Sequence, residues 1–71
     1  MYKFKSGKKD EFLQGRKITY VAKNVGITRV YLTDILNGKS ECSKLVAFCI
    51  VKVLYPEKEI ADYYELIKKG E

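Results

Sequence analysis

The chain has 71 residues, 46% of them hydrophobic and 32% charged, a balance typical of one small folded domain rather than of a disordered tail. It contains two cysteines and no histidine, so one chain can assemble neither a zinc site nor a Cys–His catalytic pair, and no other reaction chemistry is visible. The longest apolar runs fall short of the roughly 18 residues of a membrane span, and the charged N-terminus does not look like a signal peptide. We therefore expect a cytoplasmic protein that is not an enzyme, with no cofactor, metal ion, membrane partner or small-molecule ligand.

The N-terminal segment, residues 1–7, alternates aromatic and basic side chains and then reaches Ser6-Gly7, which breaks a regular element. This pattern predicts an N-terminal arm or a short strand; as an arm, it is as compatible with disorder as with a DNA or dimer contact. A first helix is expected from about Lys8 to Gln14, with Phe12 and Leu13 facing inward.

A second helix is predicted from Ile18 to Val25, because four apolar residues recur at the i, i+3, i+4, i+7 spacing of one helix face. They are Ile18, Val21, Ala22 and Val25. Gly26 is expected to end this helix in the left-handed conformation, and Ile27 to point inward. Thr28 is a natural N-cap for a third helix that runs to about Leu36.

Asn37-Gly38 is a strong turn signal, and Ser43 is suited to cap a fourth helix that ends near Leu54. The residues expected on the buried side of this helix are Leu45, Val46, Cys49, Ile50 and Val53. Cys42 and Cys49 are expected to pack as small apolar residues in a reducing compartment.

A fifth helix is predicted from about Pro56 to Lys69, since proline is tolerated in a first helical turn and Lys68 and Lys69 suit the negative end of the helix dipole. Its apolar stripe is Ile60, Tyr63, Tyr64 and Ile67. These side chains either pack inside the molecule or form a dimer patch, and both interpretations stay open. The expected fold is an all-α bundle of about five short helices in one domain, residues 1–71.

The positive charge is concentrated in the first half of the chain. Residues 1–40 carry a formal charge of +6, whereas residues 41–71 carry −1. This asymmetry fits one face for a polyanion and another for packing or a partner, although a solvated lysine-rich surface would give the same count.

The segment ITYVAKNVGITRVYLTDILNGKS, residues 18–40, resembles the helix-turn-helix of the phage repressor and Cro-like family. The positions that carry the resemblance are Val21-Ala22, Gly26, Ile27, Thr28, Leu32, Ile35 and Asn37-Gly38. The resemblance implies a lambda repressor-like DNA-binding domain, phage-encoded or bacterial, that represses transcription as a homodimer on double-stranded DNA. One departure lies at the start of the second helix, where many members carry Thr-Gln and this chain has Lys17-Ile18.

Placed on the family pattern, the third helix would enter the major groove and read bases with Arg29, Val30, Thr33 and Asp34. Arg29 is the best candidate, because its planar guanidinium can bond guanine O6 and N7 together. The carboxylate of Asp34 would accept from cytosine or pair with a cation such as Arg29. The expected phosphate contacts, partly through backbone amides, are Lys17, Thr28, Asn37, Gly38, Lys39 and Ser40.

Two other functions remain open from the sequence. One is a protein-interaction module that keeps the helix-turn-helix scaffold but binds or inhibits another protein, which Asp34 and Lys17-Ile18 would suit. The other is an architectural DNA-bending factor.

Overall fold

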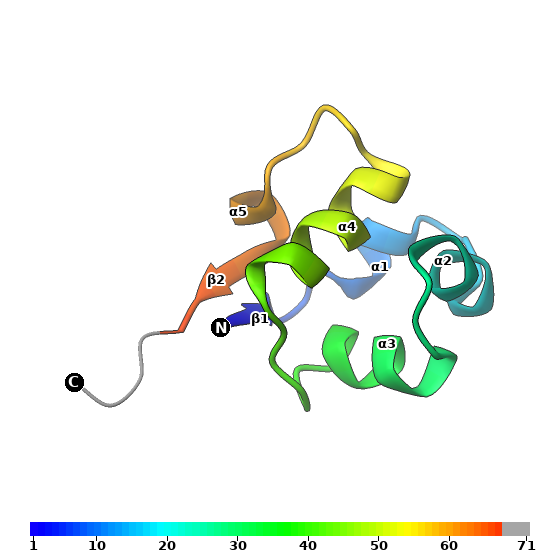
Figure 1. Cartoon of the computed structure of the whole chain (residues 1–71). Coiled ribbons are helices and arrows are strands. Elements are labelled where there is room, and N and C mark those ends of the chain that lie inside the picture. Colours follow the sequence, from blue (N-terminus) through cyan, green and yellow to red (C-terminus); the bar gives the residue numbers. More distant parts are fainter. Residues whose placement is uncertain (68–71) are drawn as a thin grey trace.

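The computed structural model describes residues 1–67, which form a mostly helical molecule with one small sheet (Figure 1). The elements in this range are β1 (Tyr2–Phe4), α1 (Lys9–Leu13), α2 (Ile18–Val25), α3 (Arg29–Leu36), α4 (Lys44–Leu54), α5 (Ile60–Tyr63) and β2 (Tyr64–Leu66). A helix lies within each of the five predicted segments, although the fifth is far shorter than predicted. The expected all-α class is wrong in one respect, because the two ends of the described chain pair as strands.

The N-terminal segment is a short strand and not a free arm. β1 runs antiparallel to β2, with Phe4 opposite Tyr64, and on its other side Tyr2 exchanges two backbone hydrogen bonds with Cys42, of 2.7 and 2.9 Å. Phe4 is 2% exposed and belongs to the core. β1 therefore lies between two later parts of the chain and joins them.

The predicted fifth helix is wrong over most of its length. α5 has only four residues, residues 64–66 are a strand, and Lys68 and Lys69 lie outside the described residues. Residues 56–58 form a turn instead of a first helical turn, and Lys52 Nζ donates to the carbonyl oxygens of Pro56 and Lys58 there. At the other end, backbone pairing with β1 competes successfully with helix continuation, and Tyr and Leu fit a pleated, half-buried surface well.

α4 has the predicted start, but of the five residues expected on its buried side Ile50 alone is fully buried, with Val46 and Cys49 half-buried. The Ser43 hydroxyl accepts from the Val46 amide at 3.3 Å, as expected of its cap. The buried residues are Ala47, Ile50 and Val51, whereas Leu45 is 71% exposed and Val53 37% exposed. Because this helix is apolar on nearly every side, the stripe containing the small Ala47 is available for the contact with α2.

The buried apolar side chains of the described residues form a single cluster. Cys42 is fully buried within it, as expected, and burial raises the pKa of its thiol to about 11, so it stays neutral at physiological pH. Cys49 is half-buried, and both cysteines are free thiols.

Two buried tyrosines differ in how their hydroxyl groups are satisfied. The Tyr55 hydroxyl donates to the Phe12 carbonyl oxygen and accepts from Arg16 at 3.3 Å. The Tyr64 hydroxyl is buried and has no hydrogen-bond partner in the part of the chain that the structure describes. A buried hydroxyl without a partner costs free energy, since it has given up its bonds to water.

We therefore expect Tyr64→Phe and Tyr55→Phe to change stability in opposite directions. Tyr64→Phe should raise the free energy of unfolding by about 1 kcal/mol, because it removes an unsatisfied group, while Tyr55→Phe should lower it by about 1 kcal/mol. Urea denaturation of the two variants and the wild type measures both values. A destabilised Tyr64→Phe variant would mean that this hydroxyl is paired in solution.

Candidate nucleic-acid interface

α2 and α3 are joined by the three residues Gly26, Ile27 and Thr28, and they lie across one another rather than side by side (Figure 1). Gly26 has φ +94°, a conformation that costs glycine little, and the amides of Gly26 and Ile27 both donate to the Ala22 carbonyl oxygen, at 2.8 and 3.1 Å. The Thr28 hydroxyl then accepts from the Tyr31 amide at 3.1 Å and caps α3. The predicted bounds of α2 and the predicted cap are confirmed.

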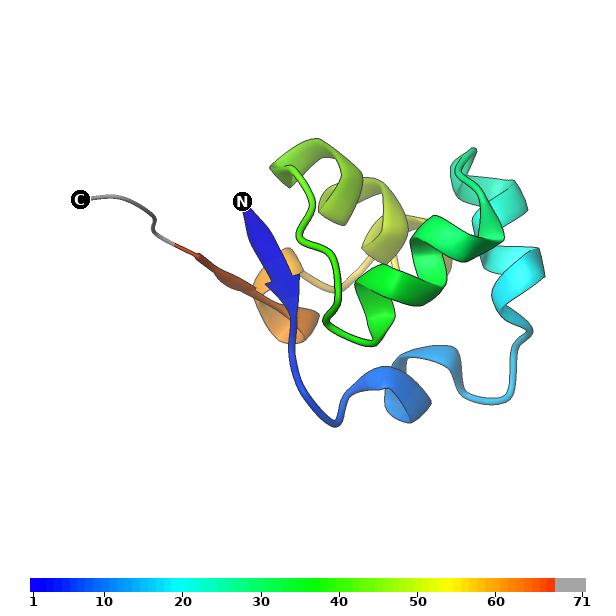
Figure 2. The ribbon, with the colours of Figure 1, turned by 90° about the horizontal axis from the view of Figure 1, so that it is seen from below.

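α3 has one buried and one open side. Leu32, Ile35 and Leu36 are buried, whereas Arg29 is exposed and Val30 is 63% exposed. Seen from below, no other ribbon crosses in front of this helix (Figure 2). The start of α3 therefore offers a cation and an apolar side chain to a partner.

The next turn of the helix is chemically more restricted. The Thr33 hydroxyl donates to the Arg29 carbonyl oxygen at 2.8 Å, so it is free only to accept a further hydrogen bond. Asp34 is half-buried, and of its two predicted partners, a cytosine amino group or a cation such as Arg29, the ion pair with Arg29 is not formed: Lys8–Glu11 is the one ion pair among residues 1–67. Thr33 and Asp34 thus present acceptors, and Arg29 presents donors.

The turn after α3 has no free backbone amides to offer a phosphate. The amide of Asn37 donates to the carbonyl of Thr33, that of Gly38 to Ile35, and those of Lys39 and Ser40 both to Asp34, at 2.8 and 3.2 Å. The expectation of amide contacts here is wrong, because the turn itself uses these donors to satisfy the end of α3. The side chains of Asn37, Lys39 and Ser40 are the groups left for such a contact.

The start of α2 differs from that of α3. Lys17 occupies its N-cap position in an extended conformation, is exposed and makes no side-chain capping bond. The first amides of α2 have no partner within the helix. Lys17 therefore adds positive charge at the positive end of the helix dipole.

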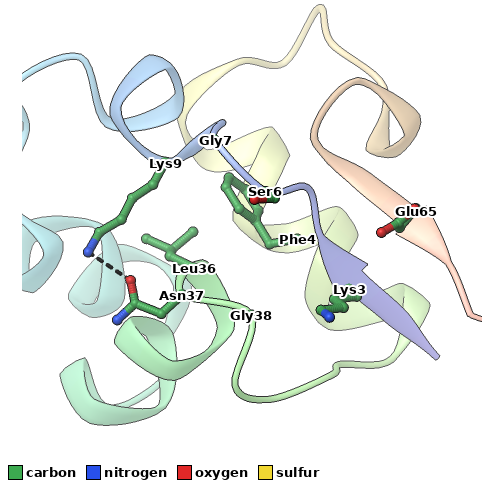
Figure 3. Close-up of a pocket in the computed structure, with 9 residues that line it drawn as sticks. All are labelled: Lys3, Phe4, Ser6, Gly7, Lys9, Leu36, Asn37, Gly38 and Glu65. Atoms are coloured by element: carbon green, nitrogen blue, oxygen red, sulfur yellow. Dashed lines mark hydrogen bonds between the residues drawn. The ribbon is translucent and has the colours of Figure 1, made fainter.

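Sequence reasoning missed a pocket at the other end of α3. Lys9 Nζ donates to Asn37 Oδ1 at 3.0 Å, and Lys3 extends across Gly38, beside a cavity of about 340 Å³ (Figure 3). Lys9 and Asn37 are separated by 28 positions, so no local spacing pattern could have paired them.

The predicted dimer residues are divided between the core and the surface. Tyr63 and Tyr64 are each 2% exposed, so these two pack inside the molecule, and burial raises the pKa of both hydroxyls. Ile60 and Ile67 are half-buried. Ile60 instead lines a separate groove of about 570 Å³ with Phe48 and Leu66.

No protein-family model, curated protein or solved structure matches this chain. Among the described residues, no group of three or more acidic, cysteine or histidine side chains is placed to hold a metal ion. None of the described helices has the length and apolar character that a membrane crossing needs.

The Thr28 cap allows a test of how the start of α3 is held. Thr28→Ala should lower the free energy of unfolding by about 1 kcal/mol, because the Tyr31 amide loses its acceptor, whereas Thr28→Ser should keep most of the stability. Thermal and urea denaturation compare the two variants. Equal losses would show that the methyl group of Thr28, and not its hydroxyl, matters.

Proposed function

We propose that this chain binds double-stranded DNA sequence-specifically and regulates transcription as a phage-type repressor, with α2 and α3 acting as a helix-turn-helix. The observation that carries the proposal is the exposed pair Arg29 and Val30 at the start of a helix whose opposite side is buried. A helix of this diameter fits the major groove, and the first residues of a recognition helix reach base edges.

Each of the four predicted reading residues on α3 has a base that suits it. Arg29 can donate two hydrogen bonds to guanine, and Val30 can contact the methyl group of thymine. Thr33 and Asp34 present acceptors, which fit the amino groups of cytosine or adenine. Around this surface Lys17 and Lys39 supply the positive charge that the phosphates require.

We further propose that the protein acts as a homodimer through the groove between α4, α5 and β2. Phe48 is 46% exposed and Leu66 54% exposed on its walls, and its polar residues carry one charge of each sign, Lys44 and Glu59. Because these two charges are opposite, Lys44 of one copy can pair with Glu59 of the other in a two-fold dimer. The groove includes no residue of α3, so the helix stays free for DNA.

A second candidate is a protein-interaction module on the same scaffold. Asp34 on the open side of α3 and the occupied amides of residues 37–40 favour it. The two functions differ in salt dependence, because neutralising phosphates releases counterions and gives a steep linear fall of log affinity with log salt.

Arg29→Ala tests the proposed reading helix. A preferred duplex is first selected from random sequences, and binding is then measured by fluorescence anisotropy. We expect the variant to bind the selected duplex roughly 5- to 150-fold more weakly and to lose preference at one base pair, which corresponds to about 1–3 kcal/mol.

The matched control is Lys58→Gln, which removes one charge from the loop between α4 and α5, at the end of the molecule away from α3 (Figure 1). It should bind as the wild type does. Unchanged affinity and preference in Arg29→Ala would remove Arg29 from the interface, and a wild type that ignores duplex DNA at low salt would rule out the function.

Phe48→Glu tests the proposed dimer. It places a charge in the apolar groove and should convert the dimer to a monomer in sedimentation equilibrium, while Val53→Glu, on the same helix but outside the groove, should not. A wild type that sediments as a monomer at concentrations that saturate the DNA would contradict the proposal.

A further inference from the structure

The pocket at the C-terminal end of α3 collects positive charge from parts of the chain that are distant in sequence. Lys3 comes from β1, Lys9 from the first turn of α1, and Asn37 from the end of α3 (Figure 3). Neither lysine is ion-paired within residues 1–67. Figure 3 shows Lys9 and Asn37 together on one side of this concave surface and Lys3 on its other side, so two ammonium groups without an ion pair among the described residues border the pocket and favour an anion.

The hydrogen-bonding capacity of the pocket is only partly used. Lys9 Nζ gives one of its three N–H bonds to Asn37 Oδ1, which leaves two for a ligand, and the amide nitrogen of Asn37 can donate as well. The Cε atom of Lys3 lies 3.4 Å from where a Cβ on Gly38 would stand, so the absence of that Cβ lets the lysine reach the turn.

Two apolar residues that line the pocket increase the attraction of its lysines for an anion. Phe4 is 2% exposed and Leu36 is 4% exposed, and both are apolar residues that line the cavity. An ion that rests against such a surface is shielded from water on one side, which increases its attraction to the lysines.

The pocket is aligned with the proposed reading surface. Arg29, Thr33 and Asn37 are four residues apart and therefore lie along one side of α3, with Arg29 at its start and the pocket at its end. The eight residues of α3 span about 12 Å, so the pocket lies about that far from Arg29, and phosphates border the major groove on both sides. A helix that reads bases at one end can thus meet a phosphate at the other.

We propose that this pocket binds one phosphate group, held by Lys9 and the side chain of Asn37 with Lys3 adding its charge from the other side of the pocket, and that the DNA backbone supplies it. The inference rests on the proposed DNA binding for the source of the phosphate. It assigns the N-terminal segment a part in the interface, because β1 carries Lys3 there.

Glu65 allows a test of whether the charge of the pocket controls phosphate binding. It also lines the pocket, opposite Lys3 in the β1–β2 register, and Figure 3 shows it on the far side of β1 from Lys9 and Asn37. Its carboxylate repels an anion. Glu65→Gln should therefore tighten phosphate binding while Lys9→Gln weakens it, a pair of opposite effects that a purely structural role would not produce.

The first arm of the experiment titrates the protein with sodium phosphate, against sodium chloride at equal ionic strength, and follows the amide resonances of Gly7, Asn37 and Gly38 by NMR. We expect saturable shifts with phosphate alone, a several-fold weaker response in Lys9→Gln, a stronger one in Glu65→Gln, and no change in the control Lys58→Gln. Identical shifts with chloride, or a Lys9→Gln variant that titrates as the wild type does, would overturn the phosphate site.

The second arm measures the salt dependence of binding to the selected duplex. Lys9→Gln should reduce the slope of log affinity against log salt by about 0.9, the value for one phosphate, and Lys3→Gln by less, in both cases without changing the preferred sequence. An unchanged slope would overturn the DNA backbone as the source, even if free phosphate binds. If the wild type binds no DNA, the proposed function fails, and the phosphate titration alone decides whether the pocket is an anion site.

Discussion

The rest of the structure depends on a cluster of aromatic rings that joins the first described elements to the last. The Phe4 ring lies 5.6 Å from that of Phe12, 6.3 Å from Tyr63 and 5.1 Å from Tyr64, measured between centroids. Phe12 also contacts Tyr63 and Tyr55, at 5.1 and 5.7 Å. Edge-to-face and offset pairs of this kind add about 0.5–1.5 kcal/mol each beyond the area they bury, so a three-residue strand with little stability of its own is held firmly.

The anchoring of β1 determines what α3 can present. β1 packs against the end of α3, and it carries Phe4 into the core and Lys3 to the Asn37-Gly38 turn. The same cluster also holds one cation, since the Arg16 guanidinium lies 5.7 Å from the centre of the Tyr55 ring and donates to its hydroxyl. The aromatic core therefore helps to position Lys3 and Arg16, although these residues lie in different parts of the sequence.

Local signals made the middle of the chain predictable. The bounds of α2, the glycine turn and the Thr28 and Ser43 caps are each determined by residues within four positions of one another, and the structure has them as predicted. The segment after Pro56 shows the limit of such patterns. Ile60, Tyr63 and Tyr64 have helical spacing, but Tyr64 pairs with Phe4, sixty positions away, and no local pattern contains that information.

The same limit applies to the candidate site. The exposure of Arg29 and Val30 follows from the apolar stripe of α3, so sequence could place them, whereas the pairing of Lys9 with Asn37 depends on where α1 packs. The structure also changes the interpretation of Asp34. Asp34 forms no ion pair with another described residue, and its backbone carbonyl oxygen accepts from two amides of the following turn. Its side-chain carboxylate therefore remains an acceptor, on a surface where Arg29 and the lysines present donors.

An acceptor in that position has a physical consequence under the proposed function. A carboxylate close to a groove lined by phosphates is repelled wherever it meets no donor, so Asp34 lowers the affinity for most sequences. Where a cytosine or adenine amino group faces it, the repulsion is offset by a charge-assisted hydrogen bond. Cations such as Arg29 and Lys9 would then hold the helix in the groove, and Asp34 would discriminate among the sequences it meets there.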